Sequence, residues 1–185
     1  ADIVPITGEN RILAAVGLAR LNSEPRLAFQ QLIPANIRRN VNISNVVFSI
    51  APKINAAGRI KHGSEAVHFM LSQDEEECKK YLNDINSLNN ERKLIDVDIT
   101  ESALQQLHKI NTNDNYSTIV YDPTWNKGVI GIVASRLVDM YYKPTIVFTQ
   151  NNEGEIVGSA RSVQGFDIHS KKKKNESLLT QYGGH

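Results

Sequence analysis

The sequence contains a single cysteine, Cys78, so no disulfide bond can form within the chain. This usage suits a reducing compartment, and we expect a cytoplasmic protein. No apolar run approaches the roughly 18 residues that a membrane-spanning helix needs. The first residues also lack the features of a secretory signal peptide. Secreted and membrane-embedded classes are therefore not indicated.

The chain also lacks an initiator methionine. Its first residues, Ala1-Asp2-Ile3-Val4, resemble the interior of a domain, and its last residues are Gly-Gly-His. We therefore expect a piece of a longer protein.

A strong excess of one charge sign is missing, because the net charge of the 185 residues is only +1. The charge is unevenly distributed, however. Residues 1–65 carry eight Lys and Arg against four Asp and Glu, whereas residues 66–112 carry five against nine. Residues 113–185 are nearly balanced, with eight against seven. This pattern indicates three segments with different roles, and the small total disfavours a protein that merely coats nucleic acid.

Glycine and proline are both absent between Glu65 and Tyr121. A capping box at Ser72-Gln73-Asp74-Glu75 predicts a helix start, and apolar residues then recur every three or four positions up to Ile110. The spacing predicts one helix of about 38 residues, or about 57 Å, which we interpret as a strut between two domains. A helical hairpin bent near Asn89-Asn90 is the alternative.

The first third of the chain contains few clear elements. Residues 8–33 are predicted to be helical with an interruption at Pro25, and the β-branched run Val46–Ile50 predicts a strand that Pro52 ends.

The last third of the chain alternates between strand and helix patterns. Strands are predicted at 118–121, 145–148 and 156–160, with a helix at 129–140 between the first two and a turn at Asn151–Gly154 before the third. Strand, helix and strand with a short crossover predict a βαβ unit, so the fold class is α/β.

Metal and nucleophile motifs cannot be assembled from residue spacing. The histidines lie far apart without paired ligands, and no Ser-His-Asp or Cys-His arrangement is indicated.

The run Gly158-Ser159-Ala160-Arg161-Ser162 surrounds one cation with small and hydroxyl residues at the end of a predicted strand. Small residues allow another backbone to approach, and the guanidinium and hydroxyls are donors suited to a phosphate. A strand that simply ends in a polar turn is the alternative.

Two further segments have a functional and a structural interpretation. In residues 122–131, Gly128 and Gly131 open a helix whose first amides attract anions, and Trp125 is placed to stack on a base; alternatively, these residues serve packing. Residues 52–62 gather three cations around Ala-Ala-Gly, which is typical of a phosphate-tracking loop but also of an ordinary basic surface loop.

Six phrases occur in order along the chain: ADIVPITGENR, APKINAAGRIKH, WNKGVIGIVASRL, VGSARS, GFDIH and YGGH. Together they resemble the DHH phosphoesterase superfamily and, within it, the bacterial exonucleases specific for single-stranded DNA. The resemblance covers essentially the whole chain except the lysines at 171–174. It implies the C-terminal region of a DHH catalytic domain in residues 1–65, a long connector helix in 66–112 and a truncated, small α/β DHH-associated substrate-binding domain in 113–185.

The resemblance also implies a function. The parent protein is expected to be a metal-dependent five-prime to three-prime exonuclease of DNA repair and recombination, with single-stranded DNA as substrate and Mn²⁺ or Mg²⁺ as cofactor. Most metal ligands of the family lie outside this chain, and Asp2 is the one metal ligand that carries over. The implied nucleic-acid-binding residues are Asn55, Arg59, Ser159, Arg161, Ser162 and His185. No catalytic residue is assigned, and a monomer is expected.

Two other functions stay open. The first is a different DHH phosphoesterase that acts on cyclic dinucleotides, short oligonucleotides or pyrophosphate; the second is a non-catalytic nucleic-acid-binding module. The sequence also departs from the family, since Asn126 stands where many relatives carry histidine and Lys171–Lys174 replace an expected amphipathic helix start.

Overall fold

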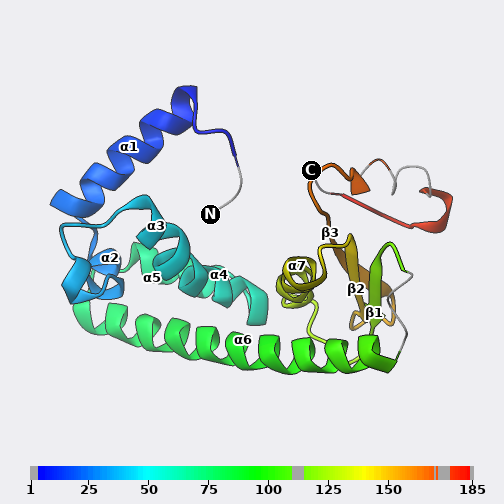
Figure 1. The fold of residues 1–185 in the computed structure, drawn as a ribbon. Helices are drawn as coiled ribbons and strands as arrows, with labels where there is room; N and C mark the ends of the chain where they lie inside the picture. The colour runs from blue at the N-terminus through cyan, green and yellow to red at the C-terminus, as the bar shows by residue number, and fades with distance from the viewer. Residues whose placement is uncertain (1–3, 110–114, 169, 171–175, 184–185) are drawn as a thin grey trace. The chain divides into compact units, whose positions relative to one another are not determined.

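A computed structural model describes residues 4–109, 115–168, 170 and 176–183 (Figure 1). It contains two compact units, Ala1–Arg92 and Lys93–His185. The first unit is helical, and the second combines helices with a three-stranded sheet. Within the described residues, no helix is both long and apolar enough to span a membrane.

The first unit is built from short helices around a small apolar core. Asn22 links the end of the first helix to the loop after the second, because its side chain donates to the Val41 carbonyl (2.9 Å) and accepts from the Val41 amide (2.7 Å). The core includes Leu32, Ile50, Phe69, Cys78 and Ile85. The elements are α1 (Gly8–Ser23), α2 (Leu27–Leu32), η1 (Ala35–Ile37), α3 (Ile43–Asn45), η2 (Val46–Ile50), α4 (Ala51–Ile60), α5 (Ser64–Leu71) and the first turns of α6 (Glu75–Lys109).

The predicted strand at Val46–Ile50 is wrong, because this run is a π-helical turn between α3 and α4. Asn42 and Asn45 form a reciprocal capping box that starts a helix here. The Ala51 amide then donates to the Val46 carbonyl five residues earlier. β-branched residues disfavour a helix by only a few tenths of a kcal/mol each, so a strong cap and burial of Ile50 override that preference.

Pro52 was predicted to end an element, but it lies in the first turn of α4. In the continuous run of α3, the π-helical turn and α4, Pro52 has no amide to donate, and the π-type bond from the Ala51 amide to the Val46 carbonyl lies directly before this missing donor. The wider π turn immediately before it also relieves the contact between a proline ring and the carbonyl four residues earlier.

The long helix is confirmed as one element, α6, of 35 residues or about 52 Å. The hairpin alternative is wrong: Asn89 is buried within the helix and accepts a hydrogen bond from Arg92 Nη2 (2.9 Å). The cap is Asp74 rather than Ser72, since Asp74 Oδ1 accepts from the Glu77 amide (2.8 Å). Ser72 instead follows the last residue of α5.

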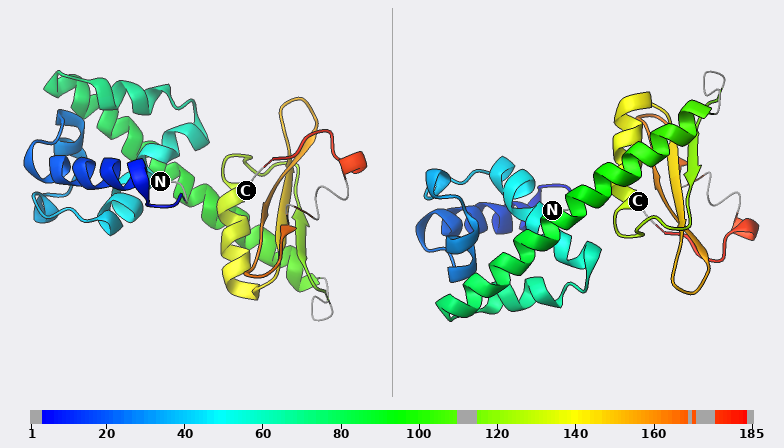
Figure 2. Two further views of the ribbon diagram at one scale, coloured as in Figure 1. Left: turned by 90° about the horizontal axis from the view of Figure 1, so that it is seen from above. Right: turned by 90° about the horizontal axis from the view of Figure 1, so that it is seen from below.

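The second unit confirms the predicted βαβ order. Its elements are β1 (Thr118–Tyr121), α7 (Ile130–Tyr141), β2 (Thr145–Gln150) and β3 (Ile156–Arg161), and η3 (Glu176–Leu178) follows. β1 and β2 are parallel with Thr118 opposite Thr145, and β2 and β3 are antiparallel with Thr145 opposite Arg161. Helix α7 covers one face of the sheet, which Figure 2 shows from two further sides.

The later turns of α6 are attached to this unit by polar contacts. Arg136 of α7 contacts Asp96 of α6 with a distance of 2.6 Å between Nη2 and Oδ2, and the Asp96 side chain is only 5% exposed. Gln106 of α6 donates to the Tyr121 carbonyl (3.0 Å) and accepts from its amide (3.4 Å). Gln106 therefore pairs with the backbone of β1 as a neighbouring strand would.

Removal of Arg136 should destabilise this unit. We expect Arg136→Ala to lower the free energy of unfolding by about 1–3 kcal/mol, because the buried Asp96 carboxylate loses a charged donor. Trp125 is the single tryptophan and is buried in this unit, so its fluorescence during a urea titration measures the change. Lys127→Ala removes an exposed cation from the same unit and should change the value by less than about 0.5 kcal/mol. Equal effects of both variants would contradict this role of the ion pair.

Candidate phosphate-binding site

The site lies where the end of β3 meets the first turns of α7. Residues of one strand alternate between faces, so Ser159 and Arg161 share the face that α7 covers, together with their register partners Val147 and Thr145. Arg161 is exposed, but its side chain has a defined set of acceptors. The structure thus brings together Ser159 and Arg161, as predicted.

The Arg161 guanidinium is held by uncharged oxygen atoms. Its Nε donates to Ser135 Oγ (3.2 Å), and its Nη1 donates to Ser159 Oγ (3.1 Å) and to the Ala160 carbonyl (2.8 Å). Among the described side chains, no carboxylate forms a salt bridge with Arg161. A positioned guanidinium to which the described residues offer no counter-charge is suited to an external anion, and to a phosphate in particular.

Gly131 of α7 makes this arrangement possible. A Cβ atom at position 131 would lie 3.0 Å from Ser159 Oγ and 3.2 Å from Arg161 Nη2. Any larger residue would therefore press on both side chains. The packing interpretation of Gly131 is confirmed, with the additional finding that what packs against it is the Arg161 cluster itself.

Gly158 has a different role, on the opposite face of the sheet. Its register partner is Phe148, and a Cβ atom at Gly158 would lie only 2.5 Å from Cδ1 of that ring. The two glycines are therefore needed for different reasons. Gly158 leaves room for the Phe148 ring of β2, and Gly131 leaves room for Ser159 and Arg161 beside α7.

Ser162 lies outside this cluster. Its hydroxyl donates to the Phe166 carbonyl (2.5 Å) and contacts the Val163 carbonyl (3.4 Å), within the turn that follows β3. In this arrangement Ser162 stabilises a turn and has no hydrogen bond with Arg161 among those of the described residues.

Asn55 and Arg59 lie on α4, so the predicted phosphate-tracking loop at residues 52–62 is wrong for most of its length. Both side chains are exposed and four residues apart, which places them on one face of the helix. Ala56 and Ala57 are fully buried on the other face, where Ala57 packs with Leu88 of α6. The two alanines of this motif are thus buried residues of a packed helix.

For the segment before α7, the sequence allowed either ligand binding or packing, and the structure shows a packing role. Trp125 is 6% exposed, and its carbonyl accepts a hydrogen bond from Thr149 Oγ1 (2.6 Å). Asn126 Oδ1 accepts from the Gly128 amide (2.8 Å) and so supports the turn into the helix. The core interpretation of Trp125 is confirmed, and stacking of its ring on a base is excluded in this arrangement.

Several predicted residues lie outside the described residues. These are Asp2, the lysines at 171–174, and His185. Within the described portion of the chain, no group of three or more His, Cys, Asp or Glu is placed to hold a metal ion. The described residues therefore do not supply a metal centre.

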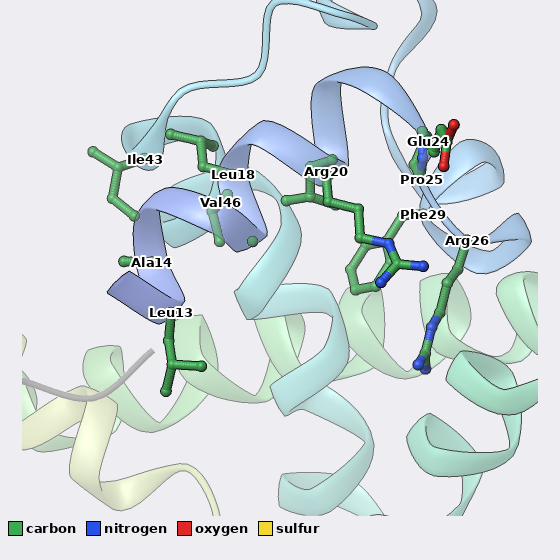
Figure 3. Close-up of a pocket in the computed structure, with 12 residues that line it drawn as sticks. Leu13, Ala14, Leu18, Arg20, Glu24, Pro25, Arg26, Phe29, Ile43 and Val46 are labelled. Atoms are coloured by element: carbon green, nitrogen blue, oxygen red, sulfur yellow. The ribbon is translucent and has the colours of Figure 1, made fainter. Parts of the chain in front are cut away.

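Two other features of the first unit were considered as sites. Burial raises the pKa of the Cys78 thiol, and Glu77 and Glu75 raise it further, so this buried thiol stays protonated at neutral pH. A cavity of about 400 Å³ lies between α1, α2 and the α3 region, with Leu13, Phe29 and Val46 in its lining (Figure 3). Arg20, Arg26 and Glu24 are its charged lining residues, and they form no group suited to metal or nucleophilic chemistry.

Sequence reasoning missed Ser135 as a neighbour of Arg161. Residues 131 and 135 are one helical turn apart, so they share a face of α7. That spacing was a usable signal, but only contact with β3 shows which face of the helix meets the arginine.

Comparison with known proteins gives one matching family and several relatives. Residues 113–185 match the DHHA1 domain. The whole chain is 37% identical to the single-stranded-DNA-specific exonuclease RecJ of Bacillus subtilis, covering 24% of that protein. It is 33% identical to RecJ of Haemophilus influenzae and 30% identical to RecJ of Escherichia coli, covering 34% of each. The chain therefore spans about a quarter to a third of the length of these relatives.

Solved structures agree with these relatives. The whole chain is similar to RecJ from Thermus thermophilus in complex with Mn²⁺, with a TM-score of 0.83 at 29% identity and 27% of that chain covered. The Mg²⁺ complex of the same protein gives a TM-score of 0.82, with 28% covered.

The close approach at Gly131 can be tested by stability. Alanine in place of an exposed helical glycine raises the free energy of unfolding by about 0.5–1 kcal/mol. We expect this gain for Gly17→Ala in α1, where an added Cβ atom would meet nothing within 4 Å. Gly131→Ala should show no gain, because its Cβ atom displaces Ser159 and Arg161. Urea unfolding followed by circular dichroism compares the two variants, and an equal gain would contradict the close approach.

Proposed function

We propose that this chain, which contains a DHHA1 domain in residues 113–185 and is similar over its whole length to a portion of RecJ, is a segment of a single-stranded-DNA exonuclease. In this proposal the longer protein hydrolyses phosphodiester bonds from the five-prime end with Mn²⁺ or Mg²⁺. The segment contributes the nucleic-acid-binding region and little of the metal site.

The observation that carries the proposal is the Arg161 cluster. A nucleic-acid backbone presents one negative charge per phosphate, and an arginine held by neutral oxygens retains its full charge for that partner. The first turn of α7 adds backbone amides and the positive end of the helix dipole close by. Ser159 and Arg161 are the residues that we assign to a DNA phosphate.

The other implied residues complete the proposal. Asn55 and Arg59, exposed on α4, contact the DNA strand from the first unit. Ser162 and His185 belong to the same phosphate-binding region, and Asp2 is a metal ligand. The domain limits are those implied by the resemblance: residues 1–65 for the catalytic domain, 66–112 for the connector and 113–185 for the DHHA1 domain.

The metal belongs to the parent protein in this proposal. Similar solved structures contain Mg²⁺ or Mn²⁺, and such an ion supplies an activated water for phosphodiester hydrolysis. The described residues of this chain do not form a site for the metal ion. Their contribution is to bind and orient the DNA strand. Roles in repair and recombination, a cytoplasmic location and a monomeric state are predictions of the same proposal.

Two alternatives differ in substrate or in chemistry. If the parent protein prefers dinucleotides to long single strands, it is another DHH phosphoesterase. If this chain alone binds single strands as tightly as the longer protein does, it acts as a binding module. The similarity of the first unit and α6 to RecJ, and not only of residues 113–185, favours the exonuclease.

The phosphate contact predicts the behaviour of Arg161→Ala. We expect this variant of the longer protein to bind a single-stranded oligonucleotide more weakly by about 1–3 kcal/mol, because a charge-assisted hydrogen bond is lost. Fluorescence anisotropy with a three-prime-labelled oligonucleotide in EDTA measures the affinity without cleavage. The slope of log affinity against log salt should fall by about 0.7, the value for one phosphate of a single strand.

Arg161→Lys is the matched control, because it keeps the charge but not the planar fork. It should retain the salt slope while losing some of the affinity. Unchanged affinity of Arg161→Ala at low salt would remove this residue from the DNA-binding site.

The incomplete metal site predicts that the 185-residue chain is inactive by itself. One aspartate, Asp2, cannot hold a metal pair, so the purified chain should not digest single-stranded DNA in the presence of Mn²⁺. Release of nucleotides from a five-prime-labelled strand is the measurement. Digestion that co-elutes with the chain and persists after further purification would overturn this assignment.

A further inference from the structure

Ser135 is a half-buried residue of α7 that lies in the phrase WNKGVIGIVASRL but is not among the implied nucleic-acid-binding residues. Its hydroxyl has one proton, which it donates to the Gly131 carbonyl one turn earlier (3.1 Å). This bond fixes the hydroxyl rotor, so the lone pairs of Oγ face away from the helix backbone. Arg161 Nε donates to that oxygen (3.2 Å).

The guanidinium of Arg161 has five N–H groups in one plane. Ser135 accepts from Nε, and Ser159 and the Ala160 carbonyl accept from Nη1. Within the described residues, Nη2 has no such acceptor, and it lies 3.2 Å from the point where a Cβ atom of Gly131 would be. The guanidinium plane is therefore held through Nε and Nη1, and Nη2 lies next to the start of α7.

We infer that Ser135 is a positioning residue for the substrate phosphate, acting through Arg161. By accepting from Nε, Ser135 fixes the rotation of the guanidinium so that Nη2 is the nitrogen that donates to the phosphate. This inference rests on the proposed function and extends it to a residue that contacts no DNA itself. Gly131 contributes to the same positioning, since it leaves room for Nη2 beside the helix.

A serine with a purely structural role would act differently. Ser23 of α1 offers the comparison, because its hydroxyl also donates to the carbonyl four residues earlier, that of Ala19 (3.1 Å), but has no arginine partner among the described residues. Ser23→Ala and Ser135→Ala remove the same local hydrogen bond. Only the second removes an acceptor from Arg161.

The first experiment tests the positioning without any ligand. Arginine side-chain NMR of the 185-residue chain records the Nε–H signal of Arg161, which is assigned by its loss in Arg161→Lys. We expect hydrogen exchange of this Nε–H to be faster in Ser135→Ala and unchanged in Ser23→Ala. Ser135→Thr keeps the hydroxyl and a backbone-bonded rotamer, and should restore slow exchange. Equal exchange in Ser135→Ala and the unmodified chain would overturn the inference.

The second experiment tests the effect on binding with a double-mutant cycle in the longer protein. Ser135→Ala should raise the Kd for a single-stranded oligonucleotide about threefold to tenfold, and Ser135→Thr less than about twofold. In an Arg161→Ala background, Ser135→Ala should add no further loss, because the serine acts through the arginine. An equal loss in both backgrounds would overturn the inference.

The two experiments separate this inference from the proposed function. If Arg161→Ala leaves the Kd unchanged, the phosphate contact fails, and with it the role of Ser135 in binding. The exchange experiment still decides whether Ser135 orients the guanidinium.

Discussion

The close approach of β3 to α7 over Gly131 is the constraint on which the candidate site depends. Because position 131 has no side chain, Ser159 and Arg161 lie against the helix instead of being pushed away from it. The same contact brings Arg161 within reach of Ser135, one turn further along α7. An exposed arginine ordinarily samples many rotamers. The hydrogen bonds to Arg161 restrict these rotamers and so fix the direction of its guanidinium.

Much of the second unit could be predicted from the sequence, because its signals are local. Strand, helix and strand patterns between Thr118 and Gln150 are bounded by turn residues, and the register of β3 follows from the short turn at Asn151–Gly154. The structure of the first unit was harder to predict from the sequence. The run Val46–Ile50 has strand propensity, yet it forms a π-helical turn because a cap at Asn42 and burial in a helical core outweigh weak intrinsic preferences.

The site was predictable only in part, for a geometric reason. Alternation along a strand places Ser159 and Arg161 on one face and separates them from Ser162, which the motif had grouped with them. Ser135 and Gly131, which the GSARS motif does not include, come from the helix that precedes β2, and no spacing rule connects a helix face to a strand across a crossover. Likewise, Ala56 and Ala57 were interpreted as part of a phosphate-tracking loop, but both are buried, and Ala57 packs with Leu88 of α6.

Helix α6 passes from one unit into the other between Arg92 and Lys93, in the middle of a regular helix. It contributes Ile85 to the first core and buries Ile99 and Ala103 in the second unit. A helix end needs a cap for its last four carbonyls; near position 92 the sequence has no glycine, and Asn89 is buried within the helix. Local melting of either unit would leave the remaining half-helix frayed at an uncapped end. Because the backbone hydrogen bonds of α6 continue past residue 92, unfolding of one unit would remove helical hydrogen bonds from the end of the half-helix that remains.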